Sequence, residues 1–373
     1  MTDNVNGKAL SEEKIFTPEE GKTITGKNIF FTGKEKIIPG KSNFIPGKSN
    51  FIPGRRNPSL PKLKIIAVVV TYNRESLLRK TIDSLFAQTY PLSNIIVVDN
   101  GSTDSTAAFL EGKKKADESA DRLTVIRQQN VGGAGGFRTG MGAAFDMDAD
   151  WIWCMDDDVF PRPDCLEHLL AQADREGIGV LAPRRLLEGK IYTNDFRRAN
   201  LTNPFKSMYE GRLSRETVNE PTFVSGTAFE GPLIRREVVS QIGLPNKDFF
   251  IFCDDTDYCL RTVAAGFKIL YVPSALMDKH KFFSNDTWAE RNVKKKWKRF
   301  YQIRNAAYLN HKYGRNWGVR YLRSFNSLAG YVVTALFTAP FSRAWKLSDI
   351  PRLVRAYRDG IAHRLGIIPN AKR

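Results

Sequence analysis

The stretch from Trp151 to Phe160 constrains the fold of this chain more than any other. It reads Trp-Ile-Trp-Cys-Met-Asp-Asp-Asp-Val-Phe, so five apolar residues run directly into three carboxylates. A continuous apolar run of this length is typical of a strand buried on both faces, as in a parallel sheet covered by helices. The three aspartates then lie at the carboxyl end of that strand, where open α/β sheets bind their ligands.

The aspartate triplet predicts a metal site. Three neighbouring carboxylates repel one another and need a cation. Because alternate side chains of an extended chain share a face, Asp156 and Asp158 can bind one ion while Asp157 points away. Carboxylate oxygens suit Mg²⁺ or Mn²⁺, particularly an ion that also holds substrate phosphates. The alternative is a solvated acidic turn that caps the next helix, but the apolar strand before it favours the metal.

The chain before this stretch alternates strand with helix. Apolar runs at 65–70, 94–98 and 123–127 predict buried strands, and the spacing of apolar residues over 76–86 predicts a helix. With the strand at Trp151, the alternation occurs four times. We therefore predict an α/β fold in which a doubly wound, mostly parallel sheet carries helices on both faces.

Each of these strands delivers polar or glycine residues to the same edge. Thr71 and Asn73 follow the first strand, and Asp99 and Asn100 follow the second. Asp99 can accept a hydrogen bond from the imide of a nucleobase. A glycine run after the third strand lets the backbone approach a ligand at a helix start, although a flexible loop has the same composition. Its members are Gly132, Gly133, Gly135 and Gly136.

A second acidic cluster lies further along the chain. Residues 185–222 are polar and predict no element, 223–229 predict a strand, and 254–266 predict a helix. Asp255 falls in the first turn of this helix, where a carboxylate can stabilise the helix by interacting with its dipole. Its position opposite the first cluster favours a catalytic base instead. Asp257 is spaced to pair with an arginine one turn on.

A single histidine follows the last predicted strand of this part of the chain. The strand spans 269–272, and His280 comes shortly after it. Lone histidines are more often structural than functional. Its place just past a strand edge favours metal ligation here.

The two ends of the chain differ from the part between them. Within residues 1–58, glycine recurs every seven residues from Gly26 to Gly54, each time followed by Lys or Arg. Glycine and proline in these repeats exclude a coiled coil and predict a low-complexity, disordered arm. From residue 291 to 373 there are 19 Lys and Arg against two acidic residues, which accounts for the whole net charge of +17. We predict a catalytic domain over 59–290 and a basic amphipathic helical region over 291–373.

The basic region predicts an anionic partner. Its most apolar window, 328–341, is too short to span a bilayer, so we expect peripheral attachment to an anionic membrane surface. The alternatives are a solvated tail or a contact in a homo-oligomer. The polar N-terminus lacks the features of a secretion signal, and the four cysteines show no disulfide pattern, so we expect a cytoplasmic protein on the inner face of the membrane.

Taken together, these motifs resemble the inverting glycosyltransferases of family 2, which have the GT-A fold. The resemblance covers residues 64–310, and it is carried by the following segments: Val68–Asn73, Val98–Asp104, the Asp156–Asp158 triplet, Asp254–Asp257 and His280. Within that family, the segment 130–137 is most similar to bacterial galactofuranosyltransferases, which use UDP-galactofuranose. Rhamnosyltransferases that use dTDP-rhamnose look similar and are the alternative.

The resemblance implies a role for each motif. Thr71 and Asp99 would hold the nucleobase of a nucleotide-sugar donor, with Asn73, Asn100, Asp157 and the glycines nearby. Asp156, Asp158 and His280 would bind Mn²⁺ or Mg²⁺. Asp255 would deprotonate the acceptor hydroxyl, implying a single displacement with inversion on a lipid-linked glycan of the cell surface. The arm stands where a polymerising galactofuranosyltransferase has a folded β-domain, which favours addition of one or a few sugars.

Two other classes of protein fit the sequence less well. A nucleic-acid-binding protein would explain the basic region and its aromatic residues, but no recognisable module accompanies them. A sugar nucleotidyltransferase would open with a glycine-rich basic loop after the first strand, whereas Thr-Tyr-Asn-Arg stands there in 71–74.

Overall fold

The computed structural model describes residues 63–116, 121–213, 218–282, 286–339 and 345–369. The chain divides into two units, residues 1–58 and 59–373, and all elements named below belong to the second. The predicted low-complexity arm lies outside the described residues.

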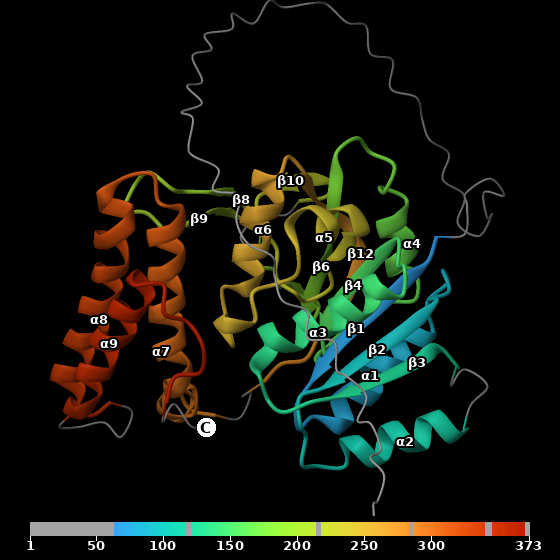
Figure 1. Cartoon of the computed structure of the whole chain (residues 1–373), viewed down its shortest axis with the longest axis horizontal. Coiled ribbons are helices and arrows are strands. Elements are labelled where there is room, and N and C mark those ends of the chain that lie inside the picture. The colour runs from blue at the N-terminus through green and yellow to red at the C-terminus, as the bar shows by residue number, and fades with distance from the viewer. Residues whose placement is uncertain (1–62, 117–120, 214–217, 283–285, 340–344, 370–373) are drawn as a thin grey trace, which may run out of the picture. The chain divides into compact units, whose positions relative to one another are not determined.

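The predicted alternation of strand and helix is confirmed in the first half of this unit (Figure 1). Strands β4, β1, β2 and β3 lie side by side in that order and are all parallel. The elements are β1 (Ile65–Thr71), α1 (Glu75–Phe86), β2 (Asn94–Asp99), α2 (Thr106–Ala116), β3 (Leu123–Arg127), α3 (Gly132–Asp146) and β4 (Trp151–Asp156).

Helices cover both faces of the sheet because successive strand residues point to opposite sides. Ile65, Ala67 and Val69 of β1 pack with residues of α1, α2 and the short helix α4 (Cys165–Leu170) on one face. Val68 and its alternate neighbours pack with α3, α5 (Arg236–Ile242) and α6 (Asp254–Ala264) on the other. Strands buried on both faces explain why their sequences are uninterrupted apolar runs.

The second half of the sheet is mixed. Strand β11 is antiparallel to both β4 and β6, while β12 runs parallel to β6 and carries β10 at the sheet edge. The elements are β5 (Val159–Pro161), β6 (Ile178–Leu187), β7 (Lys190–Ile191), β10 (Thr222–Val224), β11 (Leu233–Arg235), α5 (Arg236–Ile242), α6 (Asp254–Ala264) and β12 (Lys268–Lys279).

Two predicted boundaries in this half were wrong. The strand predicted over 223–229 ends at Val224, because the chain turns there to exchange backbone hydrogen bonds with Phe196 of β8 (Phe196–Ala199). The strand predicted over 269–272 continues to Lys279, past an irregularity in its pairing with β6. The polar segment without a prediction holds β7, β8 and β9 (Tyr209–Arg212), of which β8 and β9 form a separate two-stranded sheet.

Three long helices follow the sheet. They are α7 (Trp288–Tyr313), α8 (Arg323–Thr338) and α9 (Ile350–Ile361), with a π-helical turn over Gly318–Leu322 before α8. Phe300, Leu328 and Leu353 share one apolar core between the three helices. In the described part of the chain, every helix is too short or too polar to cross a membrane.

Helix α7 is fixed to the loop that precedes α6. Asn305, which is fully buried, donates its amide hydrogens to the carbonyls of Phe249, Ile251 and Phe252, at 3.1, 2.8 and 2.9 Å. Buried Arg304 donates to the Phe249 carbonyl at 3.1 Å. The helix thereby satisfies the backbone acceptors of a loop that would otherwise lack partners.

That loop has an unusual backbone. Phe250, Phe252 and Cys253 have φ values of 66°, 66° and 69°, in the left-handed region. Bulky residues adopt this region rarely, at a cost of about 1–3 kcal/mol each, and they persist in it only where the surroundings over-determine them. Helix α6 begins at the next residue, so the strained loop sets the place of Asp255.

Candidate functional site

The aspartate triplet lies at the carboxyl end of β4, as predicted, beside the end of β1. Asp157 turns toward β1, where it accepts hydrogen bonds from the Thr71 hydroxyl at 2.7 Å and from Arg74 at 2.8 Å. Burial raises the pKa of Asp157, while Arg74 and Thr71 oppose the shift. Asp157 therefore connects two strand ends through protein contacts.

Asp156 and Asp158 form the other part of the triplet. Burial, together with the charge of Asp158, raises the pKa of Asp156 well above its ordinary value, although Lys279 acts in the opposite direction. Buried Asp158 accepts a hydrogen bond from the Lys279 ammonium at 2.9 Å. The carboxylates were predicted to need a cation, and Lys279 of the chain itself supplies one beside Asp158.

Lys279 belongs to a buried network of alternating charges that sequence reasoning missed. Its ammonium also lies 3.0 Å from Glu230, which in turn lies 3.6 Å from Arg185. Arg185 and Asp195 are both fully buried and are paired at 2.6 Å. Burial lowers the pKa of Lys279, but Glu230 and Asp158 raise it by more, so the amine stays charged. Its members are spread over residues 158–279, so no short stretch of the sequence indicates that they meet.

The backbone of His280, and not its imidazole, contacts the triplet. Its N–H donates to the Asp158 carbonyl at 2.9 Å, while its exposed imidazole packs edge-on against Phe282. Among the described residues, no three His, Cys, Asp or Glu side chains converge as a metal site. The donor set of two carboxylates and one nearby imidazole nevertheless suits Mn²⁺ or Mg²⁺, provided that Lys279 releases its oxygen of Asp158.

The residues after β2 form a polar turn next to the triplet. Asp99 is buried, and one of its oxygens accepts the Ser102 N–H at 2.8 Å. Its other oxygen lies 3.5 Å from Arg127 and has no hydrogen-bond partner among the described residues. A buried carboxylate oxygen without a donor is costly, so this atom is suited to receive an N–H from a ligand.

Asn73 and Asn100 connect this turn to its surroundings. Asn73, at a φ of 53°, accepts the Thr103 N–H at 2.7 Å. Asn100 donates to the Gly132 carbonyl at 3.1 Å and accepts from Gln128 at 2.7 Å. Both side chains therefore order the loops of the strand edge.

The glycine run has a packing role that the sequence did not predict. A Cβ on Gly132 would lie 2.0 Å from the Phe250 carbonyl oxygen, and one on Gly136 would lie 2.5 Å from Val70. A Cβ on Gly135 would clash with Val131, whereas Gly133 faces open space. Three of the four glycines thus permit close contact with protein groups, and the partner of Gly132 is the strained loop before α6.

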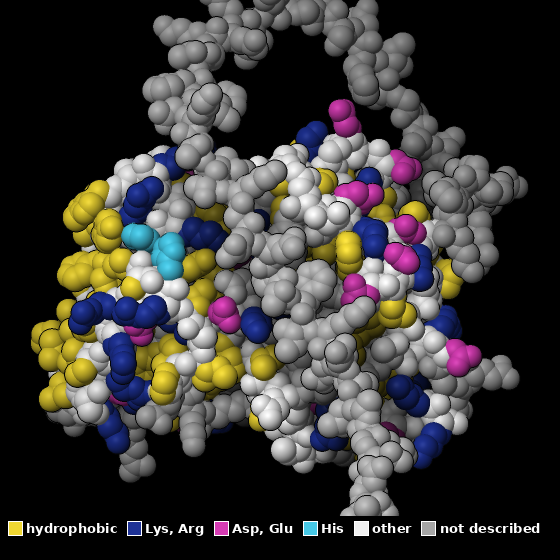
Figure 2. All heavy atoms as spheres, viewed as in Figure 1, with side chains coloured by type: hydrophobic (Ala, Val, Ile, Leu, Met, Phe, Trp, Pro, Cys, Tyr) yellow, Lys and Arg dark blue, Asp and Glu magenta, His cyan; other side chains and the backbone are white. Residues whose placement is uncertain are grey.

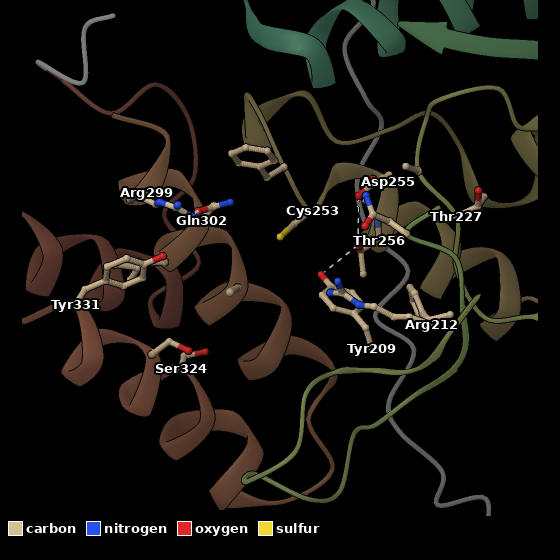
Figure 3. Close-up of a pocket in the computed structure, with 17 residues that line it drawn as sticks. Tyr209, Arg212, Thr227, Cys253, Asp255, Thr256, Arg299, Gln302, Ser324 and Tyr331 are labelled. Atoms are coloured by element: carbon tan, nitrogen blue, oxygen red, sulfur yellow. Dashed lines mark hydrogen bonds between the residues drawn. The ribbon is translucent and has the colours of Figure 1, made fainter. Parts of the chain in front are cut away.

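Asp255 lies in the first turn of α6 and lines a pocket of about 520 Å³ (Figure 3). One of its oxygens accepts hydrogen bonds from Thr256, at 2.6 Å from the backbone N–H and 3.2 Å from the hydroxyl. Burial raises the pKa of Asp255 to about 6, although the Thr256 hydrogen bonds oppose the shift. Burial and the charge of Asp255 also raise the pKa of Asp254.

The remaining acid of this cluster has a structural role, as predicted. Asp257 is buried and pairs with Arg261 at 2.9 Å. It also accepts hydrogen bonds from Lys312 at 3.0 Å and from the Tyr313 hydroxyl at 2.7 Å, both at the end of α7. Asp257 therefore holds α6 against α7, while Asp255 faces the pocket.

Comparisons with known proteins agree with this architecture. The model of glycosyl transferase family 2 matches residues 66–243. The galactofuranosyltransferase GlfT1 of Mycolicibacterium smegmatis is 27% identical over 260 residues, which cover 66% of this chain and 82% of the relative. GlfT1 of Mycobacterium tuberculosis is 31% identical over 212 residues, covering 54% of this chain and 65% of the relative.

A solved structure with a similar arrangement is the mannosyltransferase PcManGT from Pyrobaculum calidifontis, in complex with GDP-Man and Mn²⁺. It is 14% identical, with a TM-score of 0.47, over 81% of this chain and 88% of that chain. The family match spans the parallel half of the sheet, the aspartate triplet and the turn after β2. On that match and those relatives, residues 66–243 form a glycosyl transferase family 2 domain, and the chain is a glycosyltransferase.

Proposed function

We propose that the protein transfers galactofuranose from UDP-galactofuranose to a hydroxyl group of a lipid-linked glycan, with inversion at the sugar carbon. The observation that carries this proposal is the position of Asp255, whose partly buried carboxylate borders a pocket large enough for a sugar acceptor. The named relatives of the chain, which are galactofuranosyltransferases, support the choice of sugar.

In this proposal, the turn after β2 binds the nucleotide. Asp99 offers its unpartnered oxygen to the base, and Thr71, Asn73 and Asn100 position the surrounding loops. Asp157, held by Arg74, keeps the ends of β1 and β4 together below the donor. The glycines 132, 133, 135 and 136 place the start of α3 at the same edge.

Asp156, Asp158 and His280 would hold a divalent ion, Mn²⁺ or Mg²⁺. Such an ion neutralises the charge that develops on a departing diphosphate without a proton. Lys279 adds a fixed positive charge beside Asp158. Asp255 accepts the proton of the acceptor hydroxyl as that oxygen attacks the sugar from the face opposite the diphosphate.

A donor screen tests this proposal. The purified protein is incubated with Mn²⁺ and, in turn, UDP-galactofuranose, dTDP-rhamnose, UDP-glucose and UDP-galactose, and released nucleotide is measured. We expect UDP release from UDP-galactofuranose to exceed that from UDP-glucose and UDP-galactose by at least about tenfold, the discrimination that about 1.4 kcal/mol provides. Preferential release of dTDP would instead establish the rhamnosyltransferase. A nucleotidyltransferase would release no nucleoside diphosphate, and it would form a nucleoside triphosphate only after pyrophosphate is added.

We also propose that the helices after the sheet attach the protein to the cytoplasmic face of the membrane. Large apolar side chains are exposed on α8. On the left of Figure 2, where the helices after the sheet lie, Lys and Arg are interspersed with apolar side chains. Exposed fractions reach 75% at Phe337 and 50% at Leu336. An apolar helix face flanked by Lys and Arg suits the interface of an anionic bilayer, where each basic residue contributes about 1 kcal/mol.

Vesicle flotation tests this attachment. We expect the protein to float with vesicles that contain anionic lipid, and binding to weaken as salt screens the charges. Replacing Leu336 and Phe337 by Ser should lower binding at least about tenfold, because each loses about 1.5–3 kcal/mol of apolar burial. Phe205, which is 80% exposed between β8 and β9, is the matched control, and Phe205→Ser should bind normally. Absence of binding to the anionic vesicles would contradict the proposed attachment.

A further inference from the structure

We infer that the pocket beside Asp255 binds a phosphate group of the acceptor between Arg212 and Arg299. This inference rests on the proposed function in one respect, namely that the pocket is the acceptor site. It adds the chemical class of the acceptor and assigns a binding role to helices that lie beyond the region matched by the family model.

The pocket has walls from both parts of the fold (Figure 3). Tyr209 and Arg212 come from β9, and Asp255 comes from the start of α6. Arg299 of α7 and Tyr331 of α8 lie on the opposite side. A ligand that reaches Asp255 through this pocket therefore contacts the helical region as well as the sheet domain.

Arg212 and Arg299 carry charges that the described residues leave unpaired. In the described part of the chain, neither guanidinium has an ion pair with a carboxylate. Arg212 lies 5.0 Å from the centre of the Tyr209 ring, and Arg299 donates only to the neutral Gln302 at 2.8 Å.

Two basic residues near them are neutralised. Arg198 on the paired strand β8 binds Glu210 at 2.7 Å, and Lys296 on α7 binds Asp349 at 2.6 Å. Arg212 and Arg299, by contrast, both line the pocket and have no acidic partner among the described residues.

The chemistry of these side chains fits a phosphate. Guanidinium groups bind phosphate oxygens with two parallel hydrogen bonds, and aromatic neighbours restrict the orientation of the planar group. Phe196, Tyr209, Phe252 and Tyr331 give the rest of the lining an aromatic character that suits sugar rings or a lipid chain. An acceptor that places its hydroxyl at Asp255 and its phosphate between the arginines would give the carboxylate a hydrogen-bond donor and the guanidinium groups an anion.

Binding measurements on the full chain test the inference. UDP and Mg²⁺ are kept saturating so that the donor site is filled, and two probes are titrated by calorimetry, namely inorganic pyrophosphate and decyl phosphate. We expect Arg212→Ala and Arg299→Ala each to weaken binding of the phosphate probes by about 10–100-fold, the effect of losing a hydrogen-bonded charge. Arg212→Gln and Arg299→Gln keep the bulk of the side chains and should give losses of similar size.

The controls distinguish the possible results. Arg198→Ala removes a charge from the same hairpin outside the pocket and should bind both probes like the wild type. Tighter binding of decyl phosphate than of pyrophosphate would identify a lipid phosphate, and equal binding would identify the phosphate group alone. Normal probe binding by all the pocket variants, or an equal loss in Arg198→Ala, would overturn the inference.

One further measurement separates this inference from the proposed function. UDP binding by the wild type in Mg²⁺ is recorded on its own. If UDP does not bind, the transferase proposal fails, whereas binding of pyrophosphate that depends on both arginines would still establish an anion site in the pocket.

Discussion

The variant Asp255→Asn should turn over about 10²–10⁴ times more slowly than the wild type, the usual contribution of a positioned general base. Asparagine keeps the size of the side chain and can still accept the hydrogen bonds from Thr256, but it cannot take a proton. Donor affinity should stay nearly unchanged, because Asp255 lies at the acceptor pocket. Initial rates at saturating donor and acceptor, with UDP binding measured in parallel, check both expectations.

The pH dependence of turnover by the wild type should reflect titration of the Asp255 carboxylate. Burial raises the pKa of Asp255 to about 6, and only the deprotonated carboxylate acts as a base. Turnover should therefore be full above this pKa and fall as the pH decreases through it. The slow residual turnover of Asp255→Asn should lack this acidic limb.

Asp257→Asn is the matched comparison, two residues along the same helix. Asp257 binds Arg261, Lys312 and Tyr313, so Asp257→Asn weakens a buried set of charged hydrogen bonds and should lower the free energy of unfolding by about 1.5–3 kcal/mol. Its folded fraction should keep a larger turnover than Asp255→Asn. The assignment of the base is wrong if folded Asp257→Asn is the slower of the two.

Removal of the divalent ion should have an effect of similar size. We expect EDTA to abolish transfer and Mn²⁺ or Mg²⁺ to restore it, because the departing diphosphate then lacks its counter-charge. Asp158→Asn should be inactive at any metal concentration. Titration calorimetry of Mn²⁺ in the presence of UDP provides a readout other than activity, and Asp158→Asn should weaken the affinity for Mn²⁺.

Lys279 makes this experiment informative in either direction. Its ammonium already binds Asp158 and Glu230, so the chain carries a cation where the ion is proposed. Full activity in EDTA would contradict the metal and would leave Lys279 as the counter-charge of the diphosphate. In that case, Lys279→Met should abolish transfer, whereas Lys281→Met, a change to a lysine paired with Glu188 at the surface, should not.

The sequence predicted those features that depend on neighbouring residues. Apolar runs such as 65–70 located the buried strands, and the acids that follow them located the carboxyl edge of the sheet, because both signals lie within one element. The pairing of Asp257 with Arg261 was predictable for the same reason, since residues four apart in a helix are neighbours.

Contacts between distant segments could not be predicted in this way. Lys279 meets Asp158 across 121 positions of the sequence, and Asn305 meets Ile251 across 54. The clash that would exclude a side chain at Gly132 comes from Phe250, a contact that the glycine run alone could not indicate. The polar strands β8 and β9 lack a buried face with clear alternation, and this hid one wall of the pocket.

The contacts of Asn305 with the loop before α6 have a practical consequence for protein engineering. The basic helices invite deletion by anyone who wants a smaller, more tractable enzyme, since the family match ends at residue 243. A chain shortened before α7 would lose the amide that holds three carbonyls of the loop and the lysine and tyrosine that hold Asp257. Phe250, Phe252 and Cys253 would then relax from their left-handed conformations, and Asp255 would move with them. Such a shortened enzyme would still bind its nucleotide but would not transfer the sugar.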